Sequence, residues 1–151
     1  MVLRSHRRRA AIFVATVAAL ALVSAGCSGD EETTVDVTLQ EFAVVPAASS
    51  APAGDVTFNV TNEGPDDPHE FVVFKTDLAP DALPTVADGS VDEEGEGVEL
   101  IDEIEDVAVG DAPTLTVSLD AGSYVFICNI YEEEEQEAHY QEGMRVGFTV
   151  E

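Results

Sequence analysis

Hydrophobic and polar residues alternate along four short segments of the chain. Side chains at every second position face the same side of a β-strand, so each segment predicts a strand with one buried face. The segments are residues 35–40, 56–60, 115–119 and 146–150. Residues 124–128 (YVFIC) are apolar throughout and predict a fifth strand, with Tyr124, Phe126 and Cys128 on one face.

Three further segments have other patterns. Residues 71–74 (FVVF) form a continuous apolar run, which predicts a central strand buried on both faces. The spacing of apolar residues over 99–109 fits either a helical turn or a strand, and their β-branched content favours a strand. Residues 76–98 carry two prolines, three glycines and many acids, and we interpret them as an irregular acidic insertion between strands.

About seven short strands without a long amphipathic helix predict an all-β fold, a Greek-key β-sandwich. We assign the sandwich to residues 35–151, with the acidic insertion inside it, and interpret residues 27–34 as a polar tether in front of it.

The first 26 residues predict a signal peptide. Residues 1–9 contain four arginines and no acid, residues 10–23 are apolar, and small residues follow. This apolar run is shorter than the roughly 18 residues that indicate a membrane-spanning helix. The segment Ser24-Ala25-Gly26-Cys27 resembles the lipobox of bacterial lipoproteins, although Ser24 stands where that pattern prefers Leu. The resemblance implies a secreted protein whose lipidated Cys27 holds it at the outer face of the membrane.

Beyond residue 26 the chain is strongly acidic. Lys75 and Arg145 are its only bases against all 31 acids, which gives a formal charge of −29. Such a charge repels nucleic acid and anionic lipid headgroups and so excludes both as electrostatic partners. It fits either a partner with a basic surface or a saline habitat.

Four side chains make up the whole inventory of soft and imidazole ligands after residue 27. They are His69, Cys128, His139 and Met144. Each has an ordinary explanation alone, as a loop histidine or a buried apolar residue. Together, a thiolate, two imidazoles and a thioether suit copper, and the last three residues lie between the final two predicted strands.

The chain resembles the cupredoxins, the plastocyanin-like blue copper proteins. The matching segments are residues 68–71 (PHEF), 121–128 (AGSYVFIC) and 139–144 (HYQEGM), each before or after a predicted strand. The resemblance implies one type 1 copper site that cycles between Cu⁺ and Cu²⁺. It implies His69, Cys128 and His139 as the trigonal ligands, with Met144 as the weak axial ligand.

The ligand segments depart from the plastocyanin pattern in three ways. Ten residues separate Cys128 from His139, where plastocyanin-like loops are much shorter, and this interval includes the acidic run Glu132–Glu135. Glu70 stands where plastocyanins commonly carry an Asn that bridges the ligand loops. We expect the acidic run to be a solvated loop, and a backbone amide near Asn129 to donate to the Cys128 sulfur.

The resulting hypothesis is a monomeric electron carrier rather than an enzyme. A redox partner with a basic docking surface would approach near the His139 edge, and the membrane would be contacted only through the lipid anchor. Alternatives are a copper sequestration or delivery protein, or a metal-free partner-binding module of the same fold. A copper enzyme would need further histidines for a second metal centre, and the chain offers none after residue 27 beyond the two already named.

Overall fold

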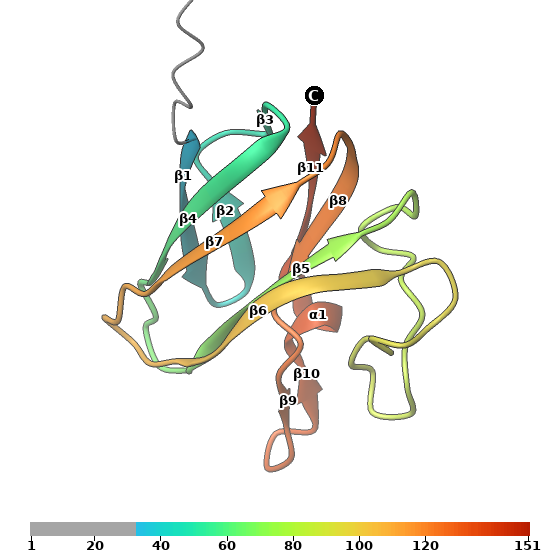
Figure 1. Ribbon diagram of the computed structural model, residues 1–151. Coiled ribbons are helices and arrows are strands. Elements are labelled where there is room, and N and C mark those ends of the chain that lie inside the picture. Colours follow the sequence, from blue (N-terminus) through green and yellow to red (C-terminus); the bar gives the residue numbers. More distant parts are fainter. Residues whose placement is uncertain (1–32) are drawn as a thin grey trace, which may run out of the picture.

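The computed structural model describes residues 33–151, which fold into a β-sandwich (Figure 1). The predicted signal peptide (1–26), Cys27 and residues 28–32 of the predicted tether lie outside this range. The strands are β1 (Thr33–Gln40), β2 (Ala43–Pro46), β3 (Ser50–Ala51), β4 (Gly54–Asn62), β5 (His69–Lys75), β6 (Glu99–Val107), β7 (Thr114–Leu119), β8 (Gly122–Ile127), β9 (Tyr131–Glu132), β10 (Glu137–Ala138) and β11 (Arg145–Val150). A short helix, α1 (His139–Glu142), precedes β11. No helix within this range is long and apolar enough to cross a membrane.

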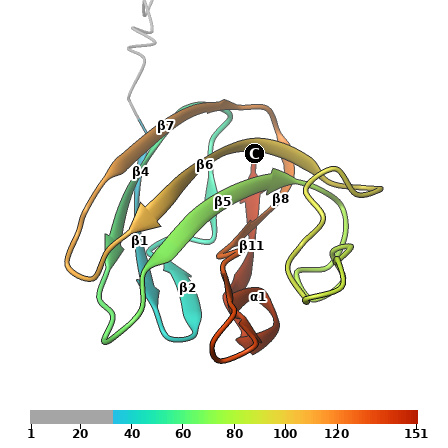
Figure 2. The same ribbon diagram turned by 90° about the horizontal axis from the view of Figure 1, so that it is seen from below.

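Two sheets form the layers of the sandwich, which Figure 2 shows from below. One sheet has the strand order β2-β1-β4-β7, and the other has the order β3-β11-β8-β5-β6. Strands β1 and β4 pair in parallel, as do β3 and β11, and the other pairs within these sheets are antiparallel. The all-β sandwich is therefore confirmed, and residues 99–107 form the expected strand. Strand β1 begins at Thr33, two residues inside the predicted tether.

A cluster of phenylalanine rings joins the two sheets at the centre of the core. Phe58 on β4 is fully buried, and its ring contacts rings from three strands of the opposite sheet. These are Phe71, Phe126 and Phe148, at centroid distances of 5.4, 5.1 and 6.1 Å. The alternation along each strand places these rings inward, because every second side chain faces the same layer. One aromatic from the first sheet thus fills the space between three strands of the second.

Strand β5 is buried on both faces, as its continuous apolar run predicts. Phe71 and Val73 face the core between the sheets, whereas Val72 and Phe74 belong to a second apolar cluster on the outer face. That second cluster includes Leu83 and Val91 of the acidic insertion. The insertion therefore covers the outer face of the sheet, which explains why β5 has no polar face.

The ends of the sandwich differ in what they carry. The chain enters β1 at one end, and the C-terminus lies at the same end (Figure 1). The opposite end carries α1 and the β9–β10 hairpin, together with the turn between β1 and β2. Asn62 fixes the loop that precedes β5 there. Its side chain donates to the carbonyls of Asp67 and Val107, both at 2.9 Å, and accepts from the backbone of Gly64 at 2.8 Å.

We expect Phe58→Ala to lower the free energy of unfolding by about 3–5 kcal/mol, because it removes a buried ring and leaves a cavity between the sheets. Urea unfolding of the metal-free protein measures this change. Val109→Ala, at a position that is 45% exposed, is the control and should change stability by less than about 0.5 kcal/mol. A similar loss in both variants would contradict the central role of Phe58.

Candidate metal centre

His69 and Cys128 are brought together by neighbouring strands of the second sheet. His69 is the first residue of β5, and Cys128 directly follows β8. These strands pair antiparallel, with Val72 opposite Ile127, so the start of β5 lies beside the end of β8. Alternation along β8 turns Cys128 into the core with Tyr124 and Phe126, as expected from the sequence. The sheet register therefore places an imidazole next to a thiol.

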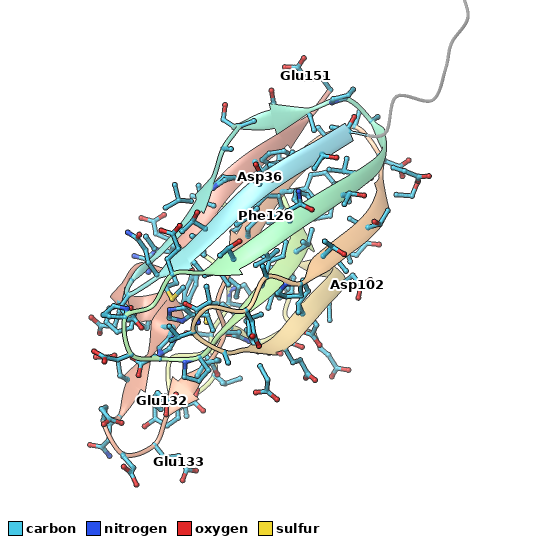
Figure 3. All side chains as sticks on the ribbon, turned by 90° about the vertical axis from the view of Figure 1, so that its left-hand side faces the viewer. Asp36, Asp102, Phe126, Glu132, Glu133 and Glu151 are labelled. Atoms are coloured by element: carbon cyan, nitrogen blue, oxygen red, sulfur yellow. The ribbon has the colours of Figure 1, made fainter. Side chains whose placement is uncertain are left out.

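The ten residues between Cys128 and His139 do not open the ligand loop. Residues 131–138 form the hairpin β9–β10, in which Ala138 pairs with Tyr131. The backbone N–H of His139 then donates to the carbonyl of Ile130 at 3.0 Å. The additional residues thus form a hairpin that extends away from the site, and its two ends lie next to each other at the site. Glu132 is partly buried and Glu133–Glu135 are exposed at its tip, and Figure 3 shows Glu132 and Glu133 at that end of the molecule.

Met144 is joined to both flanking ligands through its backbone. Its N–H donates to the carbonyl of His139 at 3.0 Å, and its carbonyl accepts from the N–H of Cys128 at 3.1 Å. Gly143 makes this tight connection possible with a φ of 132°, which L side chains rarely adopt. Met144 is fully buried in the same core cluster as Cys128.

The three strongest donors converge within the range that one metal ion requires. The Nδ1 atoms of His69 and His139 are 3.2 Å apart, and the sulfur of Cys128 lies 3.9 and 3.4 Å from them. With bonds of about 2.0 Å to nitrogen and 2.3 Å to sulfur, taking zinc as the measure, donors of one ion lie within about 4.3 Å of each other. All three residues are fully buried, and the Nε2 atoms of both histidines have no hydrogen-bond partner. The arrangement fits one mononuclear site of the His₂Cys type, with Met144 adjacent, and this donor set is that of type 1 copper.

In the absence of metal, burial favours the neutral forms of His69 and Cys128. Burial lowers the pKa of His69, and neighbouring His139 lowers it further, so its imidazole stays neutral. Burial raises the pKa of Cys128 to about 12. Two backbone N–H groups act against this rise: that of Glu70, 3.3 Å from the sulfur, and that of Ile130, one residue beyond Asn129. Metal binding must therefore displace the thiol proton.

Glu70 bridges two ligand segments. Its carboxylate accepts a hydrogen bond of 2.9 Å from the backbone N–H of Asn129, the residue after Cys128. Burial raises the pKa of Glu70 to about 7, although the hydrogen bond from Asn129 acts in the opposite direction. Glu70 thus makes the bridge expected of an amide at this position, but with a group that can ionise.

Glu41, which the sequence did not identify, lies beside the outer edge of His69. Its Oε1 is 3.7 Å from Nε2 of His69 and accepts from the backbone N–H groups of Asp66 and Asp67, at 3.0 and 2.7 Å. Burial raises the pKa of Glu41, but the backbone N–H groups of Asp67, Asp66 and Glu41 itself, together with His69, lower it, and the net shift is downward. A carboxylate behind a ligand histidine is a common way to orient the ring. It could not be found from sequence, because Glu41 is 28 positions away on the turn between β1 and β2.

The edge of His139 is covered rather than exposed. The ring of Phe42 packs against the His139 ring at a centroid distance of 5.2 Å in an edge-to-face arrangement. Phe42 itself is partly exposed, whereas His139 is fully buried. Phe42 thus lies between His139 and the surface, and docking near the His139 edge stays a prediction.

Known structures share this fold. Three examples are auracyanin from the photosynthetic bacterium Roseiflexus castenholzii (21% identity, TM-score 0.54, covering 80% of this chain and 98% of that one), auracyanin A, a "blue" copper protein from Chloroflexus aurantiacus (18%, 0.53, 80% and 99%), and rusticyanin from Thiobacillus ferrooxidans (16%, 0.51, 78% and 76%). No family model and no curated protein matches the sequence. At these identities the likeness establishes the fold, which is that of the cupredoxins.

We expect Glu70→Gln to change how stability depends on pH in the metal-free protein. Burial keeps Glu70 protonated to about pH 7 in the folded state, against 4.5 for its ordinary value, so its contribution to stability is present below pH 4.5 and is lost as the pH rises through 7. Gln retains the acceptor for Asn129 and cannot ionise. The stability of the variant relative to wild type should therefore rise between pH 4.5 and 8 in urea unfolding.

The control for this experiment is Glu151→Gln, at the exposed C-terminal residue. Its stability relative to wild type should not follow the same rise. A constant difference between Glu70→Gln and wild type across this pH range would contradict the raised pKa of Glu70.

Proposed function

We propose that this protein is a blue copper electron carrier. His69, Cys128 and His139 would hold the metal, with Met144 as the axial ligand. The observation that carries the proposal is the convergence of two imidazole Nδ1 atoms and one thiol sulfur in a fully buried pocket. Copper, when bound there, supplies a one-electron couple between Cu⁺ and Cu²⁺.

The protein contributes a site that needs little rearrangement. The donor atoms already lie at distances suited to one ion, and backbone hydrogen bonds connect the segments that carry Cys128, His139 and Met144. A fixed donor set of this kind is a compromise between the geometries that Cu⁺ and Cu²⁺ prefer, so gain or loss of an electron moves few atoms. The backbone N–H of Glu70 stabilises the thiolate.

Burial of the whole site favours electron transfer over copper delivery. His69, Cys128, His139 and Met144 are each fully buried. A delivery protein needs ligands that a partner can reach and replace, whereas an electron carrier needs only a short path to the surface. Phe42 supplies that path, because its partly exposed ring packs on His139.

The proposed setting is outside the cytoplasmic membrane. A signal peptide over 1–26, lipidation at Cys27 and a short tether would hold the monomeric domain at the outer membrane face, with no other membrane contact. The strongly acidic chain would meet a redox partner through a basic docking surface. The segments that support this anchor are the apolar run 10–23 and the lipobox-like sequence before Cys27.

Adding Cu²⁺ to the protein should produce an intense thiolate-to-copper absorption band and a narrow copper hyperfine splitting in the electron paramagnetic resonance spectrum. Cys128→Ser should abolish the band, because it removes the thiolate, and should leave the fold largely intact by circular dichroism. Cys27→Ser, the other cysteine of the chain, is the matched control and should keep the band. An intense band that persists in Cys128→Ser would overturn the assignment of the site.

Electron transfer to a cationic oxidant such as tris(phenanthroline)cobalt(III) should slow as salt is added, because salt screens the attraction to the acidic protein. Asp66 is exposed, and its N–H is bonded to Glu41, the neighbour of Phe42. Asp66→Lys should therefore slow the reaction several-fold at low salt.

The matched control is Glu151→Lys, which changes the net charge equally at the opposite end of the molecule from Glu132 and Glu133 (Figure 3). It should slow the reaction less than Asp66→Lys. Equal rates for the two variants, measured by stopped-flow absorption, would contradict docking at the Phe42 end.

A further inference from the structure

The acidic insertion, residues 76–98, contacts the segment that carries the ligands. We call these residues the strap. At its base, the hydroxyl of Thr76 donates to the carbonyl of Gly97 at 2.6 Å. Its interior is held by hydrogen bonds from Val86 to Ser90 and from Asp92 to Pro84, both 2.9 Å. The strap is therefore a folded unit, and its buried residues Leu83 and Val91 pack on the outer face of β5 and β8.

The first contact with the ligand segment is at Asn129, directly after Cys128. The side-chain carbonyl of Asn129 accepts from the N–H of Val91 at 2.6 Å. Its side-chain amide donates to the carbonyl of Val91 and to the carboxylate of Glu93, both at 3.1 Å. The Asn129 side chain thus binds both the N–H and the carbonyl of Val91, as the backbone of a neighbouring β-strand would.

The second contact is at Tyr140, directly after His139. Its hydroxyl accepts from the N–H of Leu83 at 3.1 Å and donates to the carbonyl of Pro80 at 2.9 Å. The side chain of Gln141 adds a hydrogen bond of 3.0 Å to the carbonyl of Gly89. Gly89 allows this approach, since a Cβ there would lie 3.1 Å from the Gln141 side chain.

We propose that the strap positions the ligand segment, holding Cys128 and His139 in their metal-binding arrangement through Asn129 and Tyr140. The same network reaches the third donor, because the N–H of Asn129 is bonded to Glu70, the residue after His69. The residue that follows each of the three donors is therefore held by a hydrogen bond to a residue that is not itself a ligand. Asn129 and Tyr140 are positioning residues, since they act on the metal only through their neighbours. This proposal rests on the proposed function only where its test uses bound copper; the test on the metal-free protein is independent of it.

The chain offers a matched pair of tyrosines for the test. Tyr140→Phe removes a hydroxyl bonded to the strap and keeps the ring. Tyr124→Phe removes a hydroxyl that donates to the carbonyl of Asp120 at 2.8 Å, and its side chain faces the core rather than the outer face that the strap covers. Asn129→Ala is paired in the same way with Asn59→Ala, whose amide donates to Asp36 at 2.9 Å on the first sheet.

The first measurement is the rate at which iodoacetamide alkylates Cys128 in the metal-free full chain, followed by peptide mass spectrometry to separate Cys128 from Cys27. Cys128 is fully buried, so alkylation reports opening of the ligand segment. Tyr140→Phe removes two hydrogen bonds and Asn129→Ala removes three. Because one such bond corresponds to about a fivefold change, each variant should increase the rate by about fivefold or more. Tyr124→Phe and Asn59→Ala should leave it near that of wild type. Unchanged alkylation in the first two variants, or an equal increase in their controls, overturns the proposal.

The second measurement uses the copper-loaded protein. Tyr140→Phe and Asn129→Ala should shift the thiolate-to-copper band and speed copper loss to EDTA, whereas the two controls should do neither. A wild-type protein that forms no such band overturns the proposed function and leaves the alkylation test valid. Unchanged bands and copper loss in all variants overturn the role of the strap, while the electron-carrier assignment stands.

Discussion

The backbone hydrogen bond from His139 to Ile130 is the contact on which the metal centre depends. It closes the β9–β10 hairpin and returns the chain to the sheet. His139 therefore lies beside Cys128, with its Nδ1 atom 3.4 Å from the sulfur, although ten residues separate the two in the sequence. Bonds from Cys128 to Met144 and from Met144 to His139 complete the connection. These bonds lie in a buried environment, where an unpaired backbone group is costly, and the ligand segment therefore has little freedom to open.

Apolar cover on both faces of the second sheet makes this arrangement possible. The core between the sheets receives Cys128 and Met144, and the strap covers the outer face above Phe74 and Ile127. This burial keeps the Cys128 thiol protonated and His69 neutral until a metal displaces the thiol proton. Two partly buried acids near the site, Glu41 and Glu70, have carboxylates that accept backbone hydrogen bonds. Glu41 lies 3.7 Å from His69, and Glu70 binds the residue after Cys128, so both act close to the ligands.

The strap gives the acidic insertion a role that its composition conceals. Its prolines, glycines and acids suggest an irregular surface segment, and much of it is exposed. The side chains that matter most for its placement belong to the ligand segment instead: Asn129 and Tyr140 satisfy backbone groups of the strap that strand pairing would otherwise satisfy. Such contacts leave no pattern in the sequence. The Tyr hydroxyl and the Asn amide bind backbone groups, and every residue type in the strap could supply the same backbone carbonyl.

The amino-acid pattern was enough to predict the main strands, the sandwich and the four candidate ligands, but not the short strands β2, β3, β9 and β10 or the helix α1. Alternation with a period of two is a local property, and so is the identity of a rare side chain: with one cysteine and two histidines after residue 27, few ligand sets could be assembled. It also indicated the burial of β5 on both faces and the exposure of Glu133–Glu135, although the expected loop is a hairpin and Glu132 is partly buried. Four features became apparent only from the folded chain: the long loop closes, Phe42 covers His139, Glu41 lies beside His69, and the strap is bonded to the ligand segment. Each of these depends on a contact between residues far apart in the chain, and its geometry is set by sheet register and loop closure, which no local pattern of residues encodes.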